Sequence, residues 1–203
     1  MTFVKICGIR EDSALEAALG AGADAVGFVF DPASRRYVSP AAARLLAAAA
    51  RGRALRIGVF VTDDVLGVRR VAGEVGLDAI QWSGSPVPAG ALVEMQEVWH
   101  IAVLHLEPGQ GFPGTVPPTW ACLADASGGP GGTGRLANWE AAREGARRCR
   151  LLLAGGLTPD NVGEALEEVR PFGVDVSSGV ETDGRKDPRK VADFVRAVRD
   201  HDK

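Results

Sequence analysis

Two side chains that can take part in proton transfer stand where a strand is expected to give way to a loop. Cys7 closes the apolar run "FVKIC", directly before Gly8. Asp125 closes "WACLAD", and the next helical pattern begins only near Asn138, so this aspartate is not the cap of that helix. The alternatives are a small buried thiol at Cys7 and a turn residue at Asp125. As a thiolate, Cys7 would be suited to abstract a proton.

A buried ion pair is predicted beneath Cys7. Residues two apart on a strand share a face, so Lys5 points the same way as Cys7, and Asp175 the same way as Ser177. If these strands are the first and last of a closed sheet, they are neighbours. Lys5 would then lie in the interior and require a counter-charge. We therefore predict a Lys5–Asp175 pair, whose cation would also favour the thiolate of Cys7.

Two turns with small residues follow the last two expected strands. "LLLAGGLTPDN" ends a strand with Gly155-Gly156 and then opens a helix. "VDVSSGVE" ends the next strand with Ser177-Ser178-Gly179. Exposed backbone N–H groups at a helix N-terminus, with small residues that admit an anion, form a phosphate site. The alternative is a pair of ordinary glycine-rich turns.

Other candidate motifs carry less weight. "GGPGGTGR", after Asp125, lacks the spacing of a nucleotide P-loop and indicates a loop that can approach a ligand closely. In "ASRRYVSP" one arginine could clamp a carboxylate, although adjacent arginines are usually solvated. The three histidines have no ligand-like spacing with one another or with the cysteines, so we expect no metal site. By alternation Cys122 faces away from Asp125 and lies under the helices, and Cys149 is incidental.

These side chains require a scaffold that brings strand ends together. Short apolar runs alternate with amphipathic stretches, and the runs are continuously apolar, as expected for strands covered by helices on one face. Ser39-Pro40 and Thr158-Pro159 each place a capping hydroxyl before a proline at the first helical position. Strands are predicted over Phe3–Cys7, Ala25–Phe30, Leu55–Val61, Ala79–Trp82, Ile101–Leu106, Trp120–Asp125, Leu151–Ala154 and Val174–Ser177. Helices are predicted over Asp12–Ala21, Pro40–Ala50, Asp64–Val75, Ala91–Glu97, Asn138–Arg147, Pro159–Val169 and Pro188–Asp200.

Eight strands with interleaved helices fit a closed barrel or an open doubly wound sheet. An open sheet is expected to carry a dinucleotide fingerprint after its first strand, and "CGIRED" is not G-x-G-x-x-G. We favour an α/β fold, a single (β/α)8 TIM barrel over residues 1–203, with functional groups at the C-terminal ends of its strands. Because "EPGQGFPGTVPP" stands where the helix after the fifth strand belongs, helix 5 is expected to be short or absent.

Composition bounds the class of protein. A chain of 203 residues is long enough for one sizeable core, and 46% hydrophobic with 24% charged residues is ordinary for a globular protein. The net charge of −3, with mixed signs, gives no case for nucleic acid or an anionic membrane. Apolar stretches are too short for a bilayer span, and the N-terminus has no secretory signal. Three scattered cysteines suggest reduced thiols and a cytoplasmic location.

Several stretches, taken in order, resemble the phosphoribosylanthranilate isomerase family of tryptophan biosynthesis. They are "VKICGIR", "GADAVGFVFDPASRRYVSP", "GVFV", "AIQWSG", "LADASGGPGGTG", "LLLAGGLTPDNV" and "VRPFGVDVSSGVE…GRKD". The resemblance runs nearly end to end, and "KICG" and "VDVSSGVE" are signatures of the family. It implies an enzyme without cofactor or metal, acting on a small phosphosugar that bears anthranilate. It implies no nucleic-acid or membrane partner, and it leaves monomer and homodimer open.

The resemblance also assigns roles. Cys7 would be the general base and Asp125 the general acid of an Amadori rearrangement. This reaction converts N-(5-phosphoribosyl)anthranilate to 1-(2-carboxyphenylamino)-1-deoxyribulose 5-phosphate. Arg36 would hold the anthranilate carboxylate, with Gln81 in a supporting role. The other residues expected at the substrate, with the phosphate at the glycines and Ser178, are Gly155, Gly156, Asp175, Ser177, Ser178 and Gly179.

One family position differs, and two other functions stay open. The family usually has histidine in the motif after strand four, and here "QWSG" places Ser83 there. One alternative is the related sugar isomerase of histidine biosynthesis, or a dual-substrate version, which uses aspartate in place of Cys7 and has duplicated halves. The other is a phosphate-ligand-binding barrel without catalysis, which the presence of both Cys7 and Asp125 argues against.

Overall fold

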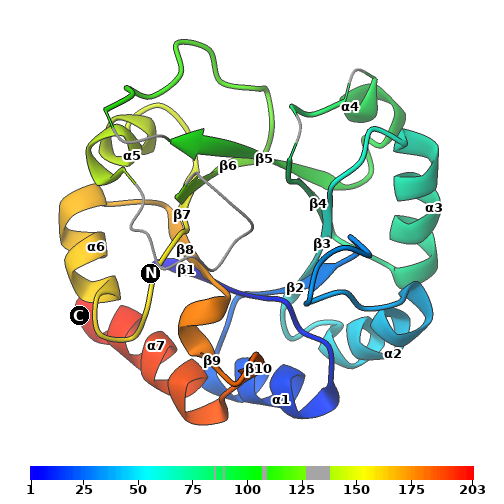
Figure 1. Ribbon diagram of the computed structural model, residues 1–203, viewed down its shortest axis with the longest axis horizontal. Coiled ribbons are helices and arrows are strands. Elements are labelled where there is room, and N and C mark those ends of the chain that lie inside the picture. Colours follow the sequence, from blue (N-terminus) through cyan, green and yellow to red (C-terminus); the bar gives the residue numbers. More distant parts are fainter. Residues whose placement is uncertain (85, 89, 107–108, 127–137) are drawn as a thin grey trace.

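A closed parallel barrel forms the centre of the molecule. The computed structural model describes residues 1–203 except 85, 89, 107–108 and 127–137. Its eight barrel strands follow one another in chain order, and β1 pairs with β8 to close the ring, which confirms the predicted TIM barrel. Figure 1 looks down this barrel and shows the helices around it. The strands are β1 (Phe3–Cys7), β2 (Ala25–Val29), β3 (Leu55–Phe60), β4 (Ala79–Trp82), β5 (Trp99–Leu106), β6 (Ala121–Ala126), β7 (Leu151–Leu153) and β8 (Gly173–Val176).

The helices cover the outside of the barrel. They are α1 (Asp12–Ala21), α2 (Pro40–Ala50), α3 (Val65–Val75), α4 (Ala91–Glu94), α5 (Trp139–Ala146), α6 (Val162–Val169) and α7 (Pro188–His201). After β8 come a 3-10 turn, η1 (Ser178–Val180), and a small hairpin of β9 (Glu181–Thr182) and β10 (Arg185–Lys186). The described residues 109–120, between β5 and β6, contain no helix, as expected for this segment. No described helix is both long and apolar enough to cross a membrane.

Helix starts follow local capping, with one correction. As predicted, α2 begins at Pro40, where the Ser39 hydroxyl accepts a hydrogen bond from the N–H of Ala42 at 3.3 Å. The prediction that a helix begins at Pro159 was wrong, because α6 begins at Val162. There the Asn161 side chain accepts from the N–H of Thr158 at 2.8 Å, and such local side-chain bonds hold a turn in place of a helix.

Alternation along the strands produces two cores. One lies between the sheet and the helices and contains Cys122, whose predicted position beneath the helices is confirmed. The other fills the barrel with side chains from successive strands, among them Ile57, Ile101, Leu123 and Leu152. Residues that face the barrel interior and lie near the C-terminal end of a strand line the mouth of the barrel. These are therefore the residues that can contact a ligand.

The two ends of the chain meet where the barrel closes. The N–H and hydroxyl of Thr2 donate to the carboxylate of Asp202 at 2.9 and 2.6 Å. Arg199, on α7, donates to the carbonyl of Thr2 at 2.5 Å and to Asp24 at 2.9 Å. Helix α1 packs against α7 beside this junction. Side-chain bonds thus fasten the last helix to the first strand.

Candidate active site

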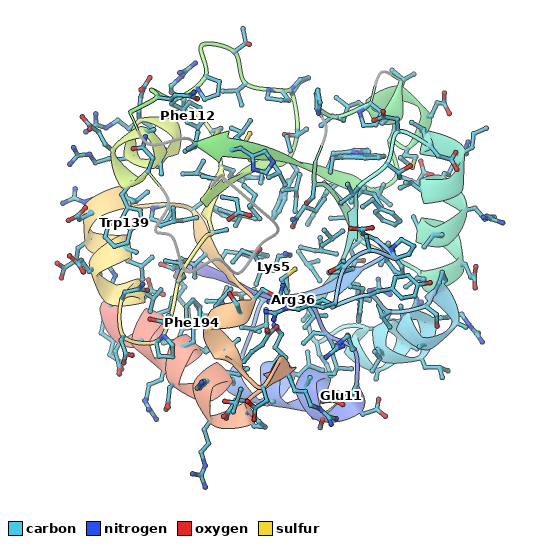
Figure 2. All side chains as sticks on the ribbon, viewed as in Figure 1. Lys5, Glu11, Arg36, Phe112, Trp139 and Phe194 are labelled. Atoms are coloured by element: carbon cyan, nitrogen blue, oxygen red, sulfur yellow. The ribbon has the colours of Figure 1, made fainter. Side chains whose placement is uncertain are left out.

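The predicted ion pair lies inside the barrel. Lys5 Nζ donates to Asp175 Oδ1 at 2.9 Å, with the lysine fully buried and the two residues in direct register across β1 and β8. Burial acts to lower the pKa of Lys5, but Asp175 and Cys7 together outweigh it and raise that pKa. Lys5 is therefore a cation inside the barrel. Figure 2 shows Lys5 and Arg36 near the centre of the ring, whereas Trp139 and Phe194 lie among the outer helices.

Cys7 ends β1 above this pair. Its side chain packs with Val29 and Val59, and the residue is only 7% exposed. Burial raises the pKa of the Cys7 thiol above its ordinary value; Lys5 and Lys186 act in the opposite direction, and Asp175 reinforces the rise. The predicted influence of Lys5 is present, but it does not overcome desolvation. The resting group is thus a thiol, and the thiolate is a minor form at neutral pH.

Two glycines leave room for these side chains. A Cβ at Gly27, on β2, would stand 2.9 Å from Cys7 Sγ and 3.3 Å from Lys5 Cε. Gly8 has a φ of +85°, and a Cβ there would meet Arg36 Cδ at 2.6 Å. The glycine after Cys7 therefore allows both the turn out of β1 and the close approach of Arg36.

An open pocket of about 390 Å³ lies at the C-terminal mouth. Most of the residues predicted at the substrate meet in its wall. The pocket is lined by Arg36, Asp125, Ala154, Gly155, Gly156, Leu157, Asp175, Val176, Ser177 and Ser178. Cys7 is not among the lining residues; it lies next to one of them, Ser177, whose hydroxyl donates to the Cys7 carbonyl at 3.0 Å. Gly179 lies behind the wall, against the backbone of Leu157.

Asp125 occupies the mouth end of β6. It has the parity of Leu123, an inner-core residue, and it lines the pocket. Its partner in register on β5 is His105, an exposed residue with the same parity as Ile101. His105 is one of the three histidines considered above only for a metal site. Counting alternate positions from Ile101 would have placed it beside Asp125.

The two glycine-containing turns after β7 and β8 pack on each other. A Cβ at Gly179 would come within 1.8 Å of the carbonyl oxygen of Leu157, so only glycine permits this approach. Gly155 and Gly156 both have positive φ, 85° and 68°. The Asn161 side chain donates to the carbonyl of Gly156 at 3.0 Å and fixes the first turn. Two backbone segments with small side chains thus converge on one side of the pocket, as an anion site requires.

Arg36 is held by Glu181, which was not among the predicted site residues. Its Nε and Nη2 donate to the two oxygens of Glu181 at 2.7 and 3.0 Å, a bidentate arrangement. Lys186 Nζ donates to the same carboxylate at 2.9 Å. Both partners belong to the hairpin after β8. They lie within "VDVSSGVE…GRKD", where alternating strand parity gives no information about them.

Gln81 faces the interior from β4 and is buried. Its amide nitrogen donates to the Ser83 hydroxyl at 3.0 Å, and its Oε1 has no hydrogen-bond partner among the described residues. His100 is a satisfied core residue, which accepts from Trp82 Nε1 at 3.0 Å. The glycine-rich stretch "GGPGGTGR" lies outside the described residues.

The arrangement suits proton transfer on an anionic substrate. A thiol on β1 and a carboxyl group on β6 border one mouth, with β7 and β8 between them on the shorter way round the ring. The backbone turns after β7 and β8 and the guanidinium of Arg36 supply positive character at the same mouth. No group of three or more His, Cys, Asp or Glu side chains suited to a metal occurs in the described part of the chain.

Comparison with known proteins finds similarity over nearly the whole chain. Residues 4–197 match the model of the family described as N-(5'phosphoribosyl)anthranilate (PRA) isomerase. A relative from Roseiflexus sp. (strain RS-1), named N-(5'-phosphoribosyl)anthranilate isomerase, is 44% identical, and the alignment covers 98% of each chain.

Solved structures agree with this match. The phosphoribosyl anthranilate isomerase from Thermotoga maritima is 34% identical, with a TM-score of 0.84 over 98% of this chain and 100% of that one. A second solved structure shows a phosphoribosyl anthranilate isomerase in complex with reduced 1-(O-carboxyphenylamino)-1-deoxyribulose 5-phosphate. It is 32% identical, with a TM-score of 0.81 and the same coverage.

Proposed function

The chain belongs to the N-(5'-phosphoribosyl)anthranilate isomerase family, and from that premise we propose which residues perform the reaction. It is an isomerase of tryptophan biosynthesis, which converts phosphoribosylanthranilate to 1-(2-carboxyphenylamino)-1-deoxyribulose 5-phosphate by an Amadori rearrangement. Cys7 is the general base and Asp125 the general acid. The observation that carries this assignment is the meeting of Cys7, Asp125, Arg36 and the two backbone turns at one barrel mouth.

Binding uses the two ends of the substrate. The phosphate lies at the turns that contain Gly155, Gly156, Ser178 and Gly179, where backbone N–H groups accommodate an anion without a side chain in the way. The anthranilate carboxylate lies at Arg36, whose guanidinium is oriented by Glu181. Asp175 contributes indirectly, as the counter-ion of Lys5, and Gln81 supports the opposite wall.

Two proton transfers, by Asp125 and by Cys7, lead to an enolamine, and its tautomerisation completes the isomerisation. Asp125 donates a proton to the ring oxygen as the bond from that oxygen to C1′ breaks, and the nitrogen lone pair forms a Schiff base. The Cys7 thiolate then removes the proton from C2′, and the electrons of that C–H bond form the enolamine. Tautomerisation of the enolamine, with a proton returned to carbon, gives the ketone. Each group in such a pair contributes on the order of 10²–10⁴ in rate.

The buried thiol is compatible with this chemistry. The reactive form needs a thiolate at Cys7 and a protonated Asp125. It contains as many protons as a thiol together with an ionised carboxylate, so one proton moved between the groups produces it. The reactive form therefore differs from a thiol–carboxylate pair only in the position of one proton.

Substitution of the two groups tests the assignment. We expect isomerisation of freshly made phosphoribosylanthranilate, followed by the loss of anthranilate fluorescence, to fall on the order of 10²–10⁴-fold in Cys7→Ala and in Asp125→Asn. Cys149→Ala, which alters a free thiol away from the pocket, is the matched control and should turn over like the wild type.

Other results would overturn parts of the proposal. Turnover that survives Cys7→Ala would remove Cys7 as the base while leaving the reaction intact. A folded wild type without turnover would favour a binding barrel or another substrate.

We also propose a cytoplasmic location, which the three free thiols support.

A further inference from the structure

Glu181 is a buried carboxylate that forms ion pairs with basic side chains from separate parts of the chain. Its side chain is 6% exposed. Besides the bidentate contact with Arg36, it accepts from Arg35 at 3.1 Å and from Lys186 at 2.9 Å. Arg35 and Arg36 precede α2, whereas Lys186 belongs to β10. One carboxylate therefore fixes the guanidinium assigned to the substrate carboxylate and fastens it to the hairpin after β8.

Lys186 connects the same hairpin to the end of β1. Its side chain is 2% exposed, and Nζ donates to the Ser177 carbonyl at 2.8 Å and to the Ser177 hydroxyl at 3.2 Å. That hydroxyl in turn donates to the carbonyl of Cys7 at 3.0 Å. The chain of contacts runs from Arg36 through Glu181 and Lys186 to Cys7. The same network of contacts thus holds both Arg36, which is proposed to bind the carboxylate, and Cys7, the proposed base.

We propose that Glu181 and Lys186 are positioning residues of this site. Glu181 orients Arg36 for the substrate carboxylate, and Lys186, a second buried cation, holds the β1 end at Cys7 through Ser177. This inference rests on the proposed function, in which Cys7 is the base and Arg36 the carboxylate-binding residue. The hairpin is therefore a working part of the site and not only a connection to α7.

The charges around Cys7 define what Lys186 should do. Lys5 on β1, Asp175 on β8 and Lys186 on β10 all act on the thiol, and Arg36 lies beyond Gly8. Lys5 pairs with Asp175 in a direct bond, and Lys186 pairs with Glu181. Burial lowers the pKa of Lys186, and Glu181 acts in the opposite direction. Through its contacts with Ser177, Lys186 lies next to the end of β1, and its positive charge favours the Cys7 thiolate.

The first test titrates the thiol directly. The ultraviolet absorbance of the Cys7 thiolate is measured against pH as the difference between a protein and the same protein carrying Cys7→Ala. In Lys186→Met we expect the midpoint to move about one pH unit higher, so that the thiolate fraction at neutral pH falls about tenfold. Lys186→Arg should return the midpoint toward the wild-type value. Lys186→Gln, which keeps a donor for Ser177 without the charge, should titrate like Lys186→Met.

Steady-state kinetics separate the two roles. Lys186→Met should lower kcat about tenfold with little change in KM, because it acts on the base. Glu181→Gln should raise KM about tenfold and leave the thiol midpoint unchanged or lower, because it releases Arg36 and removes a negative charge. Arg185→Gln is the matched control on the same hairpin; this exposed side chain pairs with Glu11, and its loss should alter neither quantity.

Three results would overturn the inference. A wild-type thiol midpoint in both Lys186→Met and Lys186→Gln would exclude the charge effect. An unchanged KM in Glu181→Gln would exclude the orientation of Arg36. Equal effects from Arg185→Gln would show that the hairpin acts only through its fold. The titration needs no substrate, so an absence of isomerase activity in the wild type would contradict the proposed function and leave the Lys186 test intact.

Discussion

Lys5 is the largest charged side chain that the barrel encloses among its described residues, and Asp175 balances it across the closure of the ring. Removing two charges from water is costly, and a close bond between them recovers that cost only as long as both are present. Loss of one member is therefore expected to destabilise the fold more than the intact pair stabilises it. Because the pair lies beneath Cys7, such a loss would also disturb the candidate active site.

The stability of the pair can be measured by removing the cation. We expect Lys5→Met to lower the free energy of unfolding in urea by about 3–5 kcal/mol, because Asp175 would be left buried without a partner. Arg53→Gln is the control: it breaks the exposed Arg53–Glu16 pair, which is screened by solvent, and should leave the unfolding curve in place. A Lys5→Met protein as stable as that control would show that the buried charge is compensated by other means.

Single residues differed in how far the sequence could predict them. The Lys5–Asp175 pair followed from alternation on two strands, once a closed ring made these strands neighbours. Asp125 was predicted at the site from its position at the end of a strand, and it lines the pocket. Glu181 and Lys186 escaped prediction because they act through a hairpin of two-residue strands, too short for any periodic pattern. The contact between Arg36 and Glu181 joins distant parts of the chain, so the spacing of residues in the sequence could not predict it.

Among the elements, the β9–β10 hairpin has a distinct part in the architecture. It connects η1 to α7, and buried ion pairs join its Glu181 to Arg36 and Lys186. Burial alone would raise the pKa of Glu181, but hydrogen bonds from Arg36 and Lys186 outweigh it and lower that pKa to about 2. The attachment of the hairpin should therefore weaken in acid.

Acid unfolding tests this dependence. A carboxyl group with a depressed pKa in the folded state stabilises the protein above its unfolded pKa, near 4.3, and that contribution disappears as the pH falls toward 2. We expect Glu181 to account for roughly 3 kcal/mol of stability lost between about pH 5 and pH 2. Urea unfolding of wild type and Glu181→Gln at several pH values should give curves that converge in acid. Parallel curves would contradict this prediction.

Most element boundaries could be predicted because local chemistry sets them. The Ser39 cap and Pro40 fix the start of α2, and the proline- and glycine-rich stretch after β5 leaves residues 109–120 without a helix. The predicted start of α6 was wrong by about one turn. The Asn161 side chain forms hydrogen bonds with Thr158 and Gly156, and this turn replaces the first turn of the predicted helix. The fold was thus more predictable than the contacts that link its loops.

As a whole, the molecule has a reactive end and a sealed end. The pocket with Arg36 and Asp125 opens at the C-terminal ends of the strands. At the other end, Trp120 stacks on Trp99 with centroids 4.9 Å apart and packs edge-to-face with Phe3 and Phe172. This aromatic layer closes the barrel from below. Substitutions there should therefore affect folding, whereas substitutions at the mouth should affect turnover.

The junction of Thr2 with Asp202 brings the two terminal segments together, so we expect that they can be joined and the chain opened elsewhere. Because the two termini are bonded to each other, a short linker from Lys203 to Met1 would follow an existing contact, and new ends could be opened at Gly52, in an exposed turn at the sealed end. We expect such a circular permutant to fold and to isomerise its substrate within about an order of magnitude of the wild-type rate. An unfolded permutant would contradict this prediction and show that folding needs the native chain order or an intact loop at Gly52. A folded permutant would show that the ring of strands can be opened at a loop away from the catalytic mouth.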